Sequence, residues 1–141
     1  MKKIYIPLLS LLLFAACKKK KQYSTWYVND EKFRTNDVKL TKGKAKHIMA
    51  PHDINNRFVI EFYLGSFPSD DRYLINCSQQ NPTWCCMVFI YNGIGYIKPK
   101  DSYLYASNNN KKFRYTLEPT WFYNESDPND SILVKGEFNE P

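Results

Sequence analysis

The chain has 141 residues, with 20 basic and 14 acidic side chains and a formal net charge of +6 at pH 7. The whole positive excess lies before Gln22, because residues 22–141 carry 14 basic and 14 acidic side chains. This neutral body has no cluster of Lys and Arg that would form the basic face required for nucleic-acid binding, so we expect no nucleic-acid partner.

The first 16 residues have the pattern of a lipoprotein signal peptide, and Cys17 is the predicted lipidation site. Lysines at positions 2–3 precede an apolar run over residues 4–14, which is too short to span a bilayer, and two alanines follow it. The segment resembles the bacterial lipobox, whose cysteine becomes the mature N-terminus and carries acyl chains. A buried hydrophobic helix and an ordinary secretory signal are the alternatives.

Four lysines, Lys18–Lys21, follow this cysteine, so residues 17–22 form a predicted basic tether. Such lysines are attracted to anionic head groups, although a solvated spacer has the same composition. No later apolar run reaches spanning length. We therefore expect membrane contact through lipid on Cys17. The expected location is the cell envelope, at the periplasmic face of the outer membrane or, alternatively, at the cell surface.

Residues 23–141 have the length of a single domain and consist mainly of short runs with alternating hydrophobicity, which is typical of β-strands. The segment 36–51 is harder to interpret and has room for strands at 38–40 and 46–49. The clearer runs predict strands at residues 25–28, 32–35, 57–64, 72–77, 84–91, 94–97, 103–106, 112–117 and 131–138.

The number of short strands and the absence of a convincing helix predict an all-β fold. The run from Trp84 to Tyr91 is apolar on both faces, which indicates a strand covered on each side by other parts of the protein. We expect an antiparallel two-layer β-sandwich, and a small β-barrel is the alternative.

Both ends of this body carry a motif. Residues 26–33, WYVNDEKF, resemble the W-x-V-N-G-x-x-F hairpin of small β-rich lipoproteins of Bacteroidota, and residues 134–138, VKGEF, resemble their final G-x-F strand. Asp30 stands where that family usually has Gly. The resemblance implies the β-rich fold and the envelope location but no activity. It further implies that Ser131, in the sequence Asp-Ser-Ile, is a candidate for O-glycosylation. A serine that stabilises its turn is the alternative.

Three cysteines remain in the body after Cys17. Cys77 ends one predicted strand, and Cys85 and Cys86 begin the next, so a hairpin would bring them together. An oxidising compartment permits a disulfide, and alternation along a strand allows only one of Cys85 and Cys86 to face Cys77. Three buried thiols are the alternative. The spacing matches no common metal site, so we predict no metal or cofactor.

Catalytic groups are poorly represented in the sequence. His52 and Asp53 are neighbours in the chain, which places them badly for one to orient the other. A carboxylate pair from Glu61 and Asp70 or Asp71 is weakly supported, because the last two lie in a turn-like segment. We predict no catalytic residue and a protein that is not an enzyme.

The aromatic content suggests a binding role. Trp121 and Tyr123 flank Phe122 next to a polar loop, and adjacent rings cannot all face inward, while Tyr103 and Tyr105 alternate along a strand. The alternative is structural: residues 121–123 are a strand with rings packed on both faces, and Tyr103 and Tyr105 form a core face. Our first hypothesis is a non-catalytic module that contacts an envelope or incoming protein, as an inhibitor, immunity or accessory factor. The alternative is a glycan-binding module that uses these rings as stacking platforms.

Overall fold

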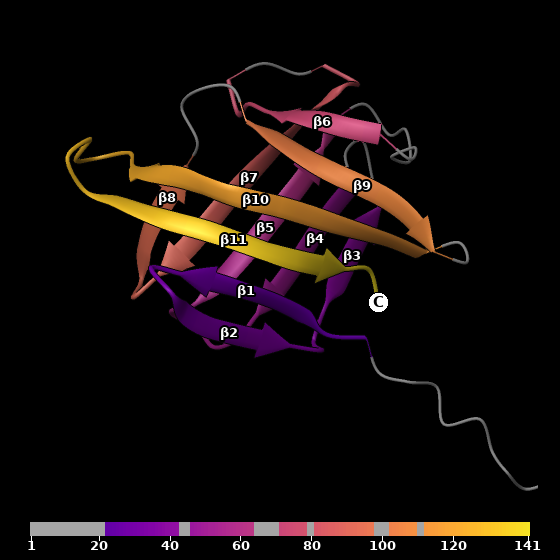
Figure 1. Ribbon diagram of the computed structural model, residues 1–141, viewed down its shortest axis with the longest axis horizontal. Coiled ribbons are helices and arrows are strands. Elements are labelled where there is room, and N and C mark those ends of the chain that lie inside the picture. The colour runs from indigo at the N-terminus through magenta and orange to yellow at the C-terminus, as the bar shows by residue number, and fades with distance from the viewer. Residues whose placement is uncertain (1–21, 43–45, 64–70, 79–80, 98–101, 110–111) are drawn as a thin grey trace, which may run out of the picture.

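The computed structural model describes residues 22–42, 46–63, 71–78, 81–97, 102–109 and 112–141. Cys17, the lysine run and Asp70 lie outside these residues. The described residues form β-strands and no α-helix, so the all-β prediction is confirmed (Figure 1). The strands are β1 (Ser24–Val28), β2 (Glu31–Thr35), β3 (Lys39–Lys42), β4 (Lys46–Pro51), β5 (Arg57–Phe62), β6 (Asp71–Ile75), β7 (Trp84–Tyr91), β8 (Ile94–Ile97), β9 (Tyr103–Asn109), β10 (Lys112–Asn124) and β11 (Ser131–Asn139).

The strands pair into one continuous sheet in the order β2-β1-β11-β10-β9-β6-β7-β5-β4-β3. β8 pairs with both β7 and β10, which closes a five-stranded barrel of β7, β8, β10, β9 and β6. The small-barrel alternative therefore describes the pairing. Figure 1 also shows the two layers expected of a sandwich, with β2, β1, β11, β10 and β9 crossing in front of β3, β4, β5, β7 and β8. These layers are hydrogen-bonded to each other through β6 and β8, so they are not separate sheets.

The prediction of a hairpin between the strands of Cys77 and Cys85 is wrong. β6 pairs with β7 in parallel, with Leu74 opposite Trp84 and Ile75 opposite Cys85. On its other edge, β6 pairs with β9 in an antiparallel arrangement. The amide of Asn76 donates to the carbonyl of Cys85 at 2.8 Å, which continues this short parallel pairing.

β10 is much longer than the predicted strand 112–117 because it contains a β-bulge. Leu117 pairs with Gly136 and Thr120 with Val134, so Glu118 and Pro119 together stand opposite Lys135. Proline has no amide to donate and is tolerated in a strand at such a bulge. The bulge interrupts the alternation of the sequence and so concealed the second half of the strand.

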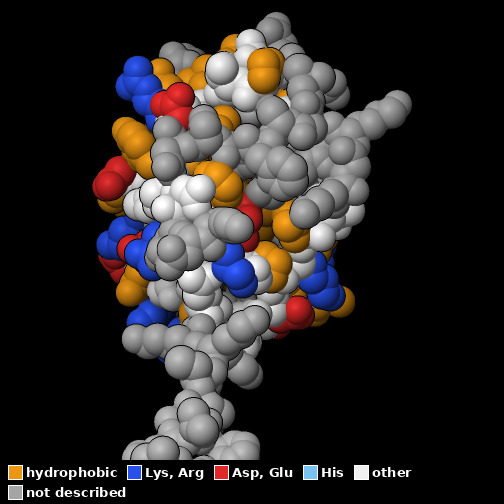
Figure 2. All heavy atoms as spheres, turned by 90° about the vertical axis from the view of Figure 1, so that its right-hand side faces the viewer, with side chains coloured by type: hydrophobic (Ala, Val, Ile, Leu, Met, Phe, Trp, Pro, Cys, Tyr) orange, Lys and Arg blue, Asp and Glu red, His pale blue; other side chains and the backbone are white. Residues whose placement is uncertain are grey.

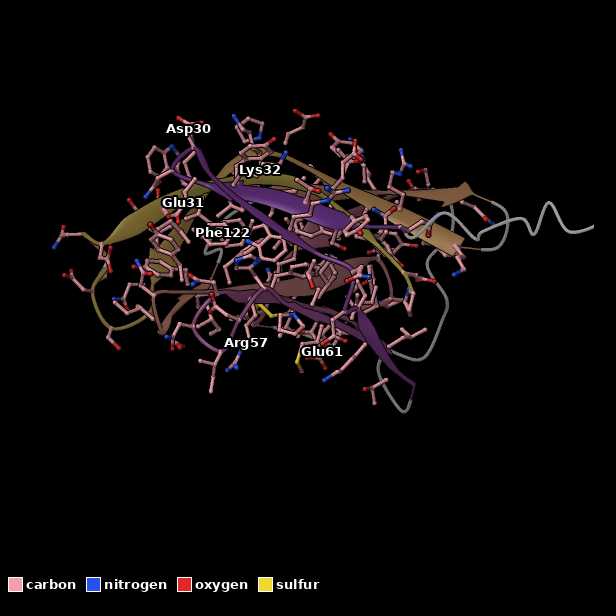
Figure 3. All side chains as sticks on the ribbon, turned by 90° about the horizontal axis from the view of Figure 1, so that it is seen from below. Asp30, Glu31, Lys32, Arg57, Glu61 and Phe122 are labelled. Atoms are coloured by element: carbon pink, nitrogen blue, oxygen red, sulfur yellow. A yellow bond between two sulfur atoms is a disulfide. The ribbon has the colours of Figure 1, made fainter. Side chains whose placement is uncertain are left out.

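The core lies between the two layers and is rich in aromatic side chains. Phe58 is fully buried, with its ring centroid 5.2 Å from that of Trp26 and 4.4 Å from that of Phe138. Phe122 lies between the layers in Figure 3, with its centroid 4.8 Å from that of Phe89. Trp26, Phe33 and Phe138 of the two terminal motifs therefore lie in the core, whereas Tyr27 does not.

The last residues of the chain hold the first strand in place. The amide of Asn139 donates to the buried hydroxyl of Ser24 at 2.9 Å, and its side-chain amide donates to the carbonyl of Tyr23 at 2.7 Å. Tyr115 donates its hydroxyl to the carboxylate of Glu140 at 2.6 Å, and both residues are buried. Burial, followed by this hydrogen bond, raises the pKa of Tyr115 well above its usual value. The domain therefore joins its two chain ends at one place.

A search of the described residues for a helix long and apolar enough to cross a membrane found none.

Candidate binding surface

The side of the front layer that faces away from the core, here called the outer face, carries three large exposed aromatic side chains. Trp121 is 48% exposed, Tyr105 46% and Tyr103 37%. Because their strand neighbours Phe122, Leu104 and Ala106 are buried, alternation directs all three rings outward. The structure thus brings three of the four predicted contact residues to one face.

The fourth predicted residue, Tyr123, is half-buried and pairs with Ser131 at the start of β11. The sequence suggested that residues 121–123 approach a loop tip. They instead belong to regular strand β10, with Phe122 pointing inward and Trp121 outward. The bulge at Glu118 and Pro119 sets this direction, because the extra residue shifts the alternation that follows it.

A groove of about 470 Å³ opens on the outer face at the bulge. Its lining mixes apolar groups with hydroxyl and charged side chains, and it was not predicted because its residues come from three strands whose pairing is tertiary. Pro119, inside an otherwise strand-like run, was the one available signal. The lining residues are Thr25, Tyr27, Thr116, Leu117, Glu118, Pro119, Lys135, Gly136 and Glu137.

Two tyrosine rings on this face, those of Tyr27 and Tyr103, are in cation–π contact with Lys or Arg side chains of the domain. The ammonium nitrogens of Lys135 and Lys32 lie 5.3 and 5.9 Å from the centroid of the Tyr27 ring. The guanidinium carbon of Arg72 lies 4.8 Å from the centroid of the Tyr103 ring. Such cation–π contacts hold the rings in place and occupy ring surface that a ligand would otherwise stack on.

The Trp121 and Tyr105 rings differ from these two. Within the described part of the chain, neither ring has an aromatic or cationic neighbour in contact. Tyr105 pairs across the strands with Thr116, at the edge of the groove, and Trp121 follows the bulge in β10. The groove is therefore flanked by two aromatic rings that no intramolecular ring contact accounts for.

The charges next to the groove are mostly paired. The ammonium group of Lys135 lies 3.3 Å from the carboxylate of Asp30, and Arg114 lies 3.9 Å from Glu137. All four groups are largely exposed, so these pairs contribute little to stability. Their effect is to leave the face close to neutral and available for a partner that buries it.

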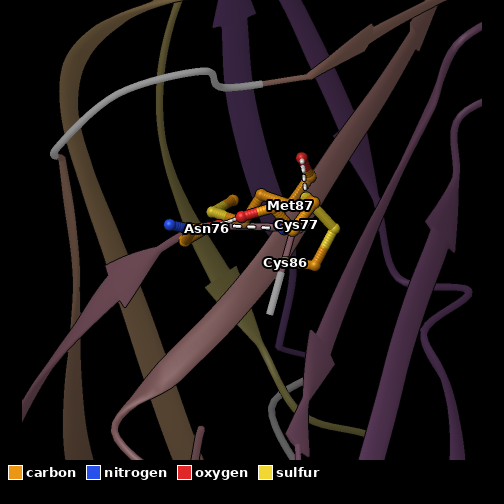
Figure 4. Close-up of a disulfide and its surroundings, with 5 residues drawn as sticks. Asn76, Cys77, Cys86 and Met87 are labelled. Atoms are coloured by element: carbon orange, nitrogen blue, oxygen red, sulfur yellow. Dashed lines mark hydrogen bonds between the residues drawn. A yellow bond between two sulfur atoms is a disulfide. The ribbon is translucent and has the colours of Figure 1, made fainter. Parts of the chain in front are cut away.

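The cysteines lie on the opposite layer. Cys77 and Cys86 form a disulfide, with their Cα atoms 4.5 Å apart, while Cys85 is a buried free thiol (Figure 4). Of the two pairings that the sequence left open, the structure has the one with Cys86. Burial raises the pKa of the Cys85 thiol far above its usual value, so the nucleophilic thiolate hardly forms there.

The histidine candidate has a local structural role. Nδ1 of His52 lies 3.0 Å from the carbonyl oxygen of Arg34, and its ring contacts Phe33 edge-on. The Asp53 carboxylate accepts hydrogen bonds from the side chain of Asn56 and from the amides of Asn55 and Asn56, which lower its pKa.

The other acidic candidates are not brought to His52. Glu61 lies in β5 of the rear layer, where Figure 3 labels it, and Asp71 begins β6, which is separated from β5 by β7. Among the described residues, no group of three His, Cys, Asp or Glu side chains is arranged to hold a metal ion.

The candidate glycosylation site Ser131 is half-buried and lies at the first position of β11. Its neighbour Asp130 accepts hydrogen bonds from the hydroxyl of Tyr96 at 2.9 Å and from the side-chain amide of Asn124 at 3.0 Å. Asp130 therefore anchors the turn between β10 and β11.

Comparisons with protein-family models, with curated proteins and with solved structures found no match to this chain. The outer face and its groove therefore carry the functional argument.

Proposed function

We propose that this chain is a non-catalytic, lipid-anchored module of the cell envelope that binds a protein partner through its outer face. The observation that carries the proposal is Trp121, which is 48% exposed on a regular strand beside a groove. Tryptophan and tyrosine are enriched in the centres of protein interfaces, where they account for much of the binding energy. Trp121 and Tyr105 are the residues assigned to this contact.

A protein partner fits the face better than a glycan does. Sugar binding by stacking needs free ring surfaces, and the Tyr27 and Tyr103 rings are in contact with Lys135, Lys32 and Arg72. A protein partner can bury such cation-bound rings together with their cations. The threonine hydroxyls of Thr25 and Thr116 in the groove are the observation that favours a glycan as the second candidate.

Anchoring through Cys17 has support from the sequence and from the cysteine chemistry of the domain. The lipobox-like segment supplies the acylated cysteine, and more than one acyl chain makes a lasting anchor. A structural disulfide such as Cys77–Cys86 is typical of exported proteins, because the cytosol keeps thiols reduced. Both features agree with a site of action outside the cytosol.

The proposal is tested by site-specific photo-crosslinking in cells that produce the protein. A photoreactive phenylalanine derivative at Thr116, on the groove, is expected to give a defined protein adduct that is lost when Trp121→Ala is added. The same derivative at Ile54, which is 78% exposed in the loop between β4 and β5, is the matched control and should give no such adduct.

Two results would contradict a protein-binding role. Equal adducts from Thr116 and Ile54 indicate random contact, and an adduct unaffected by Trp121→Ala removes that residue from the interface. If no protein adduct forms, binding of the purified domain to a glycan array, again compared with Trp121→Ala, decides for the second candidate.

A further inference from the structure

The rear layer also has a side that points away from the core, here called the rear face, formed by β3, β4, β5, β7 and β8. A row of apolar side chains crosses this face from strand to strand. The strand pairings join Met49 to Val59, Val59 to Val88 and Val88 to Ile97. Each of the four adjoins a buried residue in its own strand, so alternation directs all four side chains outward.

This apolar row is partly exposed. Met49 is 40% exposed, and the side chains of Val59, Val88 and Ile97 are half-buried. None of the four belongs to the hydrophobic core of the domain. The outer face of the front layer differs, because charged side chains lie along it, at the left margin of Figure 2. An apolar row on an exposed sheet face is typical of a surface that contacts another protein.

β5 places opposite charges on the two sides of the row. Arg57 and Glu61 each lie two residues from Val59, so all three side chains point to the rear face. In Figure 3, Arg57 and Glu61 lie on the side of the rear layer away from Phe122. The Arg57 guanidinium donates to the neutral carbonyl of Ile54 at 3.3 Å, which leaves its charge uncompensated by that contact. The row therefore has a cation on one side and an anion on the other.

A second copy of the chain is the partner that this arrangement fits. When two rear faces pack through a two-fold axis that runs along the row, β5 of one copy lies antiparallel to β5 of the other. Val59 then lies opposite Val59 of the second copy, and Arg57 lies opposite its Glu61. A two-fold axis along the strands would instead place like charges opposite each other, which is unfavourable. The charges therefore select the axis along the row.

The neighbouring positions agree with this axis. Ile90 and Cys86 lie two residues on either side of Val88 in β7, so Ile90 meets Cys86 of the second copy, and both are uncharged. At the edge strand β3, Lys39 pairs with Met49 and is exposed, so its ammonium group extends into solvent at the rim. The axis thus brings apolar groups together in the centre.

The rear face has the size of a small protein interface. Strands spaced about 4.8 Å apart make a five-stranded face about 19 Å wide, and strands of six residues make it about 20 Å long. Such an area is at the lower end of specific interfaces. We therefore expect a dimer that exchanges with the monomer.

We propose that this chain forms a two-fold symmetric dimer through its rear face, with Arg57 of each copy paired to Glu61 of the other across the apolar row. The second copy covers the outward side of β7, which accounts for the apolar residues on both faces of this strand. The outer face with Trp121 belongs to the other layer, so it stays open in both copies. The dimer depends neither on the proposed lipid anchor nor on the proposed partner.

The test is photo-crosslinking of the full chain in cells that produce it. A photoreactive phenylalanine derivative at Met49, on the row, is expected to give an adduct of twice the chain mass. The same derivative at Thr116, on the outer face of the front layer, is the matched control and should give no adduct of this mass.

Charge reversal tests the pairing. Arg57→Glu and Glu61→Arg each place like charges opposite each other, so each should lower the yield of the Met49 adduct by at least about fivefold. The double variant Arg57→Glu/Glu61→Arg restores opposite charges and should return the yield to within about twofold of the parent chain. Glu61 also interacts within its own chain, so recovery in the double variant is the deciding result. Near-UV circular dichroism of the purified variants checks that each is folded.

The inference is overturned by the absence of a double-mass adduct from Met49, or by equal double-mass adducts from Met49 and Thr116. It is also overturned if the single reversals leave the yield unchanged, or if the double variant gives no more adduct than they do. An adduct between two copies is recognised by its mass, so it is distinct from an adduct with another protein. Loss of the dimer therefore leaves the proposed partner surface intact, and loss of that surface leaves the dimer unaffected.

Discussion

The front layer of this domain carries a tryptophan on each of its two faces, and the two residues differ in burial. Trp26 is 1% exposed, stacks on Phe33 and meets Phe58 edge-on, whereas Trp121 is 48% exposed and faces outward beside the groove. The inner residue belongs to the motif at residues 26–33. The outer residue lies outside both terminal motifs.

The contrast separates what specifies the fold from what is available for function. In the inner motif, Trp26 pairs across the strands with Phe33 on one side and with Gly136 on the other. Residues from both ends of the chain thus build one contact in the core. The core positions of the two motifs therefore concern the architecture, whereas the exposed rings of Trp121 and Tyr105 lie outside the motifs.

The largest expected effect comes from truncating the two tryptophans in turn. Trp26→Ala should lower the free energy of unfolding by about 4 kcal/mol, because it leaves a cavity among Phe33 and Phe58. Trp121→Ala should change it by less than about 0.5 kcal/mol, as is usual for a surface substitution. Chemical denaturation measures both values. Equal losses would contradict the division between the faces.

The two faces of β7 differ in the same way: Cys85 faces the core, whereas Cys86 faces outward and forms the disulfide with Cys77. Replacing Cys77 and Cys86 together by Ala should lower the free energy of unfolding by about 3 kcal/mol, because the closed loop no longer restricts the unfolded chain. Thiol titration of the native protein should find Cys85 unreactive until denaturant is added. A reactive Cys85 in the native state would contradict its burial.

The third prediction concerns Gly136, where β11 passes close to β1. A Cβ atom at this position would lie 2.7 Å from Cβ of Trp26 and 2.8 Å from the carbonyl oxygen of Thr25. Gly136→Ala should therefore cost about 2 kcal/mol of unfolding free energy through overpacking. Gly95→Ala is the matched control, since its nearest neighbour would be 3.8 Å away. A similar cost at both positions would indicate a general backbone effect.

A pH-dependent effect is expected for Tyr96 at high pH. Burial, followed by the hydrogen bond to Asp130, raises the pKa of Tyr96 to about 12. A tyrosine in the unfolded chain loses its proton near pH 10, so between about pH 10 and 12 the unfolded state binds fewer protons than the folded state. The contribution of Tyr96 to stability should therefore be constant below this window and fall as the pH rises through it. Tyr96→Phe should reduce the slope by about 1.4 kcal/mol per pH unit in denaturation experiments. An unchanged slope would contradict this role.

Much of the fold was accessible from alternation alone. β5 and β7 were predicted closely because each has six or more residues with a clear inner and outer set. β3 and β4 were uncertain because they are short and lysine-rich, as is common for strands near a sheet edge. The parallel pairing of β6 and β7 depends on β9, a strand distant in sequence, and no local pattern encodes it.

Only part of the candidate surface could be predicted from the sequence. Trp121, Tyr103 and Tyr105 were identified because exposed rings leave a mark in the sequence pattern. The groove was missed because it depends on how Thr25, Glu118 and Lys135 come together across three strands. The cations above Tyr27 and Tyr103 were missed for the same reason, although they decide which rings remain free.

The position of β11 between β1 and β10 has a consequence for the order of folding. The bond between Ser24 and Asn139 joins residues that are 115 positions apart, so the first strand has only β2 as a partner until the end of the chain arrives. A two-stranded hairpin is marginally stable in water. In a chain that crosses a membrane N-terminus first, as the predicted signal implies, β1 and β2 emerge early and wait. Of the described strands β11 arrives last, and its pairing with β1 and β10 completes the sheet.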